Sequence, residues 1–412
     1  MRTPMKLDYK KIIITLVLVA VFGLVVYFVW QGIAGPASPG VPAVSSSTPS
    51  APNLPGGSLP ASSTSSPQTL GGGTITFGTS SPAIIRVSNN PAEAYWIDGQ
   101  TQGIFYLNQD GQVFLVNKNK DGKDTQITQQ KMGALNTIAI GPGSQRVLAS
   151  FGDPRAPQWG VFDDVDQVWR PLPSTVLSAA WGGDNNTFYG VVQNGSVPAL
   201  ASIDMSRGNA VTKILIKDFR FQDVQLSFLP PSTLLLTERA SAHYPSRVWK
   251  IDTASLAVHL LMGGQNGLVL TLSDDKRIMF SFIGNAFQIL DPYTLSSVAP
   301  VPFLTLPPKC TFSGVIAYCF VPDSQNFKNA TLPDDYLTLK LFTSDTLYEV
   351  NAANGGMAFS NIPKLLNNGV FDAINPIFSN GFLYFRNRLD NYVYALNLTS
   401  DQFSQNGQRV GD

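Results

Sequence analysis

Cysteine and histidine are almost absent from this chain, which contains two of each among 412 residues. A zinc site built on the two cysteines would need further ligands, and His243 and His259 are the only histidines. The sequence also lacks a Gly-x-Ser-x-Gly nucleophile elbow and a glycine-rich phosphate loop. We therefore expect no metal centre and no cofactor, and find no sequence argument for the common hydrolase or nucleotide sites.

An excess of charge of one sign is also missing, because 28 Lys and Arg residues balance 28 Asp and Glu residues. The chain has no net positive charge that would attract a polyanion, so nucleic acid is not an expected partner. Charged residues make up only 14% of the chain, whereas 44% are hydrophobic and 11% aromatic. This composition favours a large core built from strands, and no convincing amphipathic helical stripe occurs after residue 73.

One long apolar run is present, at residues 12–30, where nineteen residues carry no charge. As a helix it would extend about 28 Å, close to the thickness of a bilayer's hydrocarbon core. The basic residues before it predict a cytoplasmic tail at residues 1–11. We expect a single-pass protein of the cell membrane, with all later residues outside the cytoplasm. A cleaved signal peptide is the alternative.

Residues 31–73 are rich in Pro, Ser, Gly, Ala and Thr and contain no charge. Such a composition buries too little apolar surface to offset the entropy of ordering, so it predicts a disordered linker. Residues 74–403 are expected to form the folded domain, and residues 404–412 a polar tail.

Short apolar runs with period-two alternation, separated by turn residues, fill the predicted domain and indicate an all-β fold. A unit of strand, tight turn and strand recurs along it. The turns are centred near Thr101, Gly143, Asp184, Pro231, Asp275, Ser313 and Asn380, with successive spacings of 42, 41, 47, 44, 38 and 67 residues. Seven such units predict a seven-bladed β-propeller, with six or eight blades as alternatives.

The last unit shows only three clear strands, and two apolar segments, residues 74–78 and 83–88, precede the first unit. We expect one of these segments to complete the last blade, which closes the ring and leaves no open sheet edge.

This pattern resembles that of the TolB-like and WD-repeat-like bacterial β-propellers over residues 74 to about 403. Their usual turn sequence, Ser-Pro-Asp-Gly, is degraded here, and residues 273–276 (Ser-Asp-Asp-Lys) are the best copy. The stretch from residue 306 to residue 336 is similar to a segment of uncharacterised membrane-anchored propellers, which implies no known activity.

The two cysteines, Cys310 and Cys319, flank a turn that begins at Ser313 and Gly314. On neighbouring strands of a hairpin they would lie nearly opposite each other, close enough for a disulfide. An oxidising compartment outside the cytoplasm favours this bond, whereas two buried thiols would fit a cytosolic protein.

A weak candidate for a calcium loop begins at Asn117, because Asn117, Asn119 and Asp121 alternate before Gly122. The twelfth position is Thr128, where calcium loops of this type have a bidentate Glu. A plain turn between the third and fourth strands of a blade explains these residues equally well.

Three long loops are expected between second and third strands, and these connections emerge on one face of a propeller. The loops supply a mixture of Arg and aromatic residues typical of interfaces, although they are also explained as tolerated insertions. The candidate partner-binding rim consists of Arg155, Trp159, Arg239, His243, Tyr244, Arg247, Phe327 and Tyr336.

The expected function is that of a membrane-tethered extracytoplasmic scaffold that binds a protein or peptide partner on this rim. The alternative is a binder of cell-wall polysaccharide, or a hydrolase or lyase, that uses the central channel. The predicted innermost strands are almost devoid of charge, which argues against catalysis there.

Overall fold

The computed structural model describes residues 84–117, 122–221, 223–352, 360–361 and 370–398. They all belong to one compact unit, Thr76–Asp412. The predicted cytoplasmic tail, membrane span, linker and polar tail lie outside the described residues. Among the residues that are described, no helix has the length and apolarity needed to cross a membrane.

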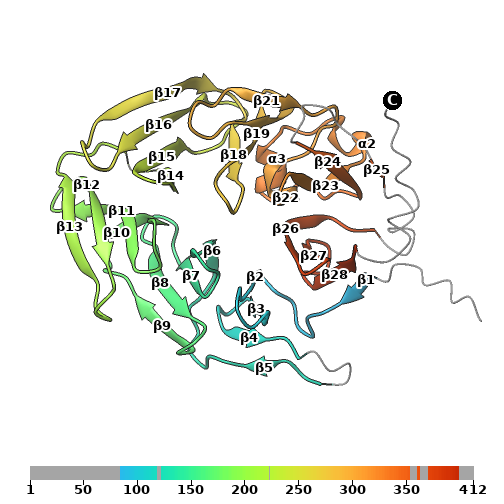
Figure 1. The fold of residues 1–412 in the computed structure, drawn as a ribbon, viewed down its shortest axis with the longest axis horizontal. Coiled ribbons are helices and arrows are strands. Elements are labelled where there is room, and N and C mark those ends of the chain that lie inside the picture. Colours follow the sequence, from blue (N-terminus) through green and yellow to red (C-terminus); the bar gives the residue numbers. More distant parts are fainter. Residues whose placement is uncertain (1–83, 118–121, 222, 353–359, 362–369, 399–412) are drawn as a thin grey trace, which may run out of the picture. The chain divides into compact units, whose positions relative to one another are not determined.

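The described strands form seven four-stranded antiparallel sheets, which Figure 1 shows arranged around a central opening. The prediction of a seven-bladed β-propeller is therefore confirmed. Blade 1 contains β2 (Ala94–Ile97), β3 (Ile104–Leu107), β4 (Val113–Leu115) and β5 (Thr125–Gln126). Blade 2 contains β6 (Leu135–Ile140), β7 (Arg146–Phe151), β8 (Gln158–Asp163) and β9 (Val168–Pro171). Blade 3 contains β10 (Val176–Trp181), β11 (Thr187–Asn194), β12 (Val197–Asp204) and β13 (Val211–Ile216).

The remaining blades follow the same order. Blade 4 contains β14 (Val224–Leu229), β15 (Thr233–Glu238), β16 (Ser246–Asp252) and β17 (Val258–Gln265). Blade 5 contains β18 (Val269–Leu272), β19 (Met279–Ile283), β20 (Ala286–Leu290) and β21 (Ser297–Pro300). Blade 6 contains β22 (Cys310–Ser313), β23 (Ile316–Pro322), β24 (Asp345–Asn351) and β25 (Ser360–Asn361). Blade 7 contains β26 (Ala373–Ser379), β27 (Phe382–Asn387), β28 (Val393–Asn397) and β1 (Ile84–Arg86).

The only helices in the described part of the chain are short. A 3-10 helix, η1 (Pro307–Lys309), precedes blade 6, and α2 (Ser324–Phe327) and α3 (Asp334–Leu337) lie between β23 and β24. All seven predicted turn positions fall at the connection between the first and second strands of a blade. The long last spacing of 67 residues arises because blade 6 carries this helical insertion.

The ring is closed by β1, which pairs antiparallel with β28 and places Ile84 opposite Leu396. This confirms that one of the two early apolar segments completes blade 7, and residues 74–78 lie outside the described residues. Ile84 packs against the core of blades 6 and 7, whereas Ile85 is 49% exposed. The first described strand and the last one are therefore joined in one sheet.

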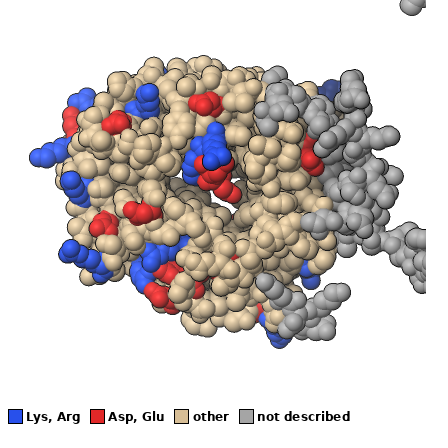
Figure 2. Space-filling model, in the orientation of Figure 1, with Lys and Arg blue, Asp and Glu red and all other residues tan. Residues whose placement is uncertain are grey.

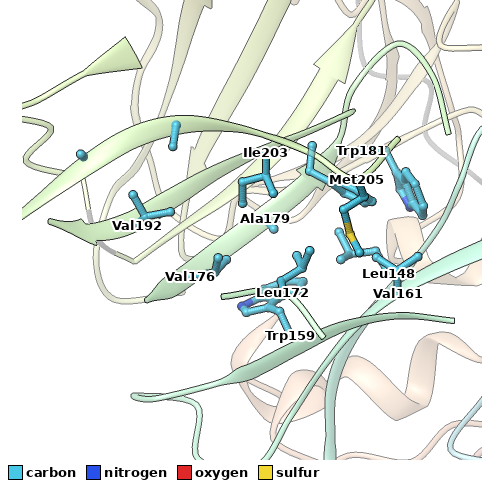
Figure 3. Packing of buried hydrophobic residues seen from close by; sticks show 13 residues of the cluster. Leu148, Trp159, Val161, Leu172, Val176, Ala179, Trp181, Val192, Ile203 and Met205 are labelled. Carbon is cyan, nitrogen blue, oxygen red and sulfur yellow. The ribbon is translucent and has the colours of Figure 1, made fainter. Parts of the chain in front are cut away.

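The core lies between neighbouring blades, which explains why the middle strands have continuous apolar sequences. All four residues of β3 are buried, whereas the outermost strand β13 is exposed along its first half. Figure 3 shows the cluster between blades 2 and 3, where Trp159 and Leu148 pack with Val176 and Trp181. Each blade needs its neighbours to cover both faces of its sheet.

The predicted disulfide between Cys310 and Cys319 is confirmed. The two residues are direct partners across β22 and β23, with their Cα atoms 4.2 Å apart. Gly314, at a positive φ of 60°, makes the two-residue turn that sets this register. The bond lies within the core between blades 5 and 6.

Candidate functional site

The insertion at residues 323–344, which we call the strap, does not stay on its own blade. It begins after β23 and ends before β24 in blade 6, yet Asp334 in α3 reaches the loop between β15 and β16 in blade 4. The backbone N–H of Ala242 donates to Asp334 Oδ1 at 2.9 Å, and Ser241 Oγ lies 3.4 Å from Asp334 Oδ2. The strap therefore joins two blades that are not neighbours.

The strap also packs against blade 5. Leu332 and Tyr336 of the strap are buried against Phe282 of β19 and against Leu306. Gly267 lies beside the strap at a φ of 72°, and an added Cβ would be in ordinary contact with the Leu332 carbonyl oxygen at 3.5 Å. A residue with a side chain would be strained here because of the left-handed backbone conformation.

A fully buried set of charges fastens the strap to blades 6 and 7. Lys309 Nζ lies 2.6 Å from Asp345 Oδ2, 2.7 Å from Asp372 Oδ1 and 2.9 Å from Thr343 Oγ1. Arg388 Nη1 lies 3.2 Å from Asp372 Oδ2, so two cations face two carboxylates. We call Lys309, Asp345, Asp372 and Arg388 the buried network.

Aromatic rings complete this network on the strap side. The Arg388 guanidinium lies 3.9 Å from the centre of the Tyr336 ring and donates to the Tyr336 carbonyl oxygen at 3.1 Å. Burial alone would lower the pKa of Lys309, but Tyr336 and the two carboxylates outweigh it and raise this pKa. The ammonium therefore stays charged over the whole physiological range.

The predicted rim residues differ in exposure and in the contacts of the loops that carry them. Arg155, Arg239, His243, Tyr244 and Arg247 are exposed, and Phe327 is half-buried against the core under the strap. Among the described residues, hydrogen bonds join the strap to the blade-4 loop (residues 239–245), and none joins either to the loop that carries Arg155. The structure thus brings together the members from blades 4 and 6.

Trp159 and Tyr336 are buried and not available at a rim. Trp159 is the second residue of β8, and its side chain points into the core between blades 2 and 3 (Figure 3). Tyr336 is 2% exposed and lies between the buried network and the core of blade 5. Neither side chain is included in the surface described below.

The strap also exposes apolar side chains that the prediction omitted. Leu337 is 48% exposed, Leu339 62% and Phe342 45%, and Tyr244 of the adjoining blade-4 loop is 75% exposed. The signal was in the sequence, because residues 336–342 alternate large apolar residues with Thr and Lys in a connecting segment. We call Arg239, Tyr244, Arg247, Leu337, Leu339 and Phe342 the strap surface.

A cavity of about 370 Å³ lies where the strap meets the ring. Its lining comes from the blade-4 loop, the connection to blade 5, the turn between β19 and β20, and the strap. The lining residues are Ala242, Asn266, Gly267, Gly284, Asn285, Ala330, Thr331 and Leu332. Ala242 belongs to the same blade-4 loop as Tyr244 of the strap surface.

The calcium-loop candidate lies partly outside the described residues, which include Asn117 but neither Asn119 nor Asp121. Asp124 follows it and is held by the protein: it accepts hydrogen bonds from Tyr106 Oη and from the backbone N–H groups of Asn89 and Asn117. No group of three or more potential metal ligands occurs among the described residues. The calcium loop remains an untested prediction.

The central channel contains a cavity of about 350 Å³ whose wall is mostly neutral. Gln225, Ser227, Thr271 and Asn375 contribute polar groups among apolar side chains. Figure 2 shows side chains of both charges at the central opening. Within the described wall of the cavity, the charged residues are Asp274 and Lys276.

No family model matches this chain, and no curated protein matches it either. Several solved structures share its fold at low identity. The β-propeller domain of Cps50 (Swd1) from Myceliophteria thermophila has a TM-score of 0.47 and 11% identity, covering 77% of this chain and 100% of that one. TolB from Acinetobacter baumannii has a TM-score of 0.39 and 11% identity, covering 64% of this chain and 61% of that one.

An oligogalacturonate lyase in complex with manganese has a TM-score of 0.48 and 14% identity, covering 77% of this chain and 92% of that one. At such identities the likeness concerns the fold alone. What this chain binds must therefore be argued from its own residues.

Proposed function

We propose that this protein is a membrane-tethered, extracytoplasmic β-propeller that binds a protein or peptide partner on the strap surface. The observation that carries the proposal is the strap itself, an insertion that contacts blades 4, 5 and 6 through hydrogen bonds and buried side chains and still exposes large apolar residues. An insertion without a role would not need these contacts with three blades. A binding surface does gain affinity when its side chains are ordered before the partner binds, because less conformational entropy is then lost on binding.

The composition of the strap surface indicates the chemistry of the partner. Tyr244, Leu337 and Leu339 offer apolar contact area, and the neighbouring cavity can receive an anchoring side chain. Arg239 and Arg247 are exposed, and their nearest carboxylates are only loosely engaged, at 3.9 Å for Asp223 and 3.6 Å for Glu238. The fitting partner presents apolar anchors beside acidic side chains.

Site-specific photocrosslinking in the cells that make the protein tests this proposal. A photoreactive phenylalanine analogue at Tyr244 or at Leu339 should yield the same covalent adduct. The same analogue at Val211, which is 58% exposed on the outer strand of blade 3, is the matched control and should yield none. Absence of an adduct from both strap-surface positions, or the same adduct from Val211, would contradict the proposal.

The membrane tether needs its own experiment, and the apolar run at residues 12–30 supports it. We expect the full chain to stay in the membrane pellet after alkaline extraction. The double variant Val19→Asp, Val25→Asp should be released, because each carboxylate costs about 3 kcal/mol in a membrane-spanning helix. Protease added outside intact cells should degrade the propeller, and protection from it would refute the extracytoplasmic location.

A further inference from the structure

The structure holds a second candidate binding site, in the central channel and independent of the strap surface. It is centred on the turn between β18 and β19, which reaches toward the middle of the ring (Figure 1). This turn joins a first strand to a second one. It therefore lies at the opposite end of the strands from the strap and the blade-4 loop, which join second strands to third ones.

Alternate residues of this turn have different roles. Asp275 stabilises the turn, since its Oδ1 accepts hydrogen bonds from Ser273 Oγ at 2.7 Å and from the Arg277 N–H at 3.1 Å. Asp274 and Lys276 instead line the channel cavity. The turn thus fixes one residue for structure and directs its two neighbours into the channel.

Asp274 and Lys276 face the channel as separate charges. Among the described residues neither head group has a hydrogen bond or an ion pair, and the two are not within 4.0 Å of each other. Asp274 is exposed to the channel and Lys276 is half-buried. Desolvation raises the pKa of Asp274 and lowers that of Lys276, and the charge of each residue partly offsets the shift of the other. Two opposite charges that face one cavity without forming a direct ion pair favour a ligand that can pair with both.

We propose that the channel binds a small zwitterion of the α-amino-acid type. Its ammonium group would pair with the Asp274 carboxylate, and its carboxylate with the Lys276 ammonium. The adjacent polar wall groups, including Thr271 and Thr311, are available for hydrogen bonds to the ligand, and Leu272 and Phe312 for apolar contact. A cavity of about 350 Å³ is within the range of small-molecule sites.

The test screens the detergent-solubilised full chain against the twenty L-amino acids, one at a time, by thermal shift and then calorimetry. At least one should bind, and its amide and its N-acetyl derivative, each lacking one charge, should bind at least tenfold more weakly. Asp274→Asn and Lys276→Gln should each raise the dissociation constant at least tenfold. Exposed residues of the same charges, changed as Lys213→Gln and Asp218→Asn, are the matched controls and should leave it unchanged.

Two results with the channel residues and the unmodified chain would overturn this proposal, and a third concerns a variant on the opposite face. One is that no amino acid binds the full chain. The other is that binding is the same in both channel variants as in the unmodified protein. Tyr244→Ser on the opposite face should retain amino-acid binding, and loss of binding there would also overturn the assignment to the channel. This variant separates a failure of the channel site from a failure of the strap surface.

Discussion

Lys309 and Asp345 form an ion pair of 2.6 Å in which both side chains are fully buried. The pair connects η1 before blade 6 to the first residue of β24, where the strap ends. Asp372 and Arg388 complete a set of two positive and two negative charges. Removing any one of the four leaves a buried charge without compensation.

We expect Lys309→Met to destabilise the protein by about 3–5 kcal/mol, because it leaves a buried carboxylate without compensation. Urea denaturation of the purified chain measures this. Lys213→Met, at an exposed position, should change the stability by less than about 0.5 kcal/mol. The double variant Lys309→Met, Asp345→Asn should recover part of the loss, and a single variant as stable as the control would contradict our view of the network.

The disulfide between Cys310 and Cys319 should stabilise blade 6 by about 2.5 kcal/mol, as expected for closing a loop of this length. Changing both cysteines to Ser should remove this contribution, and a reducing agent should do the same to the unmodified protein. Denaturation with and without reductant measures both effects. The Ser variant should be insensitive to reductant, and a further loss of stability upon reduction would show that the bond is not the cause.

Asp164 should make the protein less stable as the pH rises. Desolvation, followed by the charges of Asp98 and Asp163, raises its pKa from its ordinary value of 3.8 to about 7. The folded protein therefore holds this proton more tightly than the unfolded chain, so the free energy of unfolding falls between about pH 4 and pH 7. The full effect is at most about 4 kcal/mol.

Asp164→Asn should abolish this part of the pH dependence and raise the stability at pH 8 by on the order of 2 kcal/mol. Denaturation curves at pH 5 and pH 8 provide the measurement. Asp218→Asn, at an exposed position, should leave the difference between the two pH values unchanged. An Asp164 variant that keeps the original pH dependence would show that this carboxyl group titrates normally.

Ring closure provides a prediction with an internal control. Ile84 of β1 packs into the core between blades 6 and 7, and Ile85 on the other face is exposed. We expect Ile84→Ala to cost about 1–2 kcal/mol and Ile85→Ala less than about 0.5 kcal/mol. Equal effects of the two substitutions on the free energy of unfolding would contradict the burial of Ile84 and the exposure of Ile85.

The features that the sequence predicted correctly depend on local patterns. Turn residues near Thr101 and Gly143 recur with a regular spacing, and the two cysteines flank a turn that a hairpin requires. The blade count and the disulfide follow from such signals. The completion of blade 7 by β1 also followed, because a closed ring needs a fourth strand there.

The features that were missed depend on contacts between distant residues. Lys309 contacts Asp345 and Asp372, which lie 36 and 63 residues away in the sequence. Because lysine is seldom fully buried, the residues around Lys309 do not predict its burial or these ion pairs. Likewise, no local pattern indicates that Asp334 contacts Ala242 across 92 residues. The sequence predicts Trp159 in a loop, but it lies inside β8, where strand geometry directs its side chain into the core.

The strap also removes the rotational equivalence of the ring. Seven similar blades by themselves would present a binding partner with seven nearly equivalent surfaces, each related to the next by a fixed rotation. Because the strap crosses only blades 4, 5 and 6, it makes this sector different from the rest of the ring. A partner that recognises this sector can therefore bind in only one rotational orientation about the ring axis.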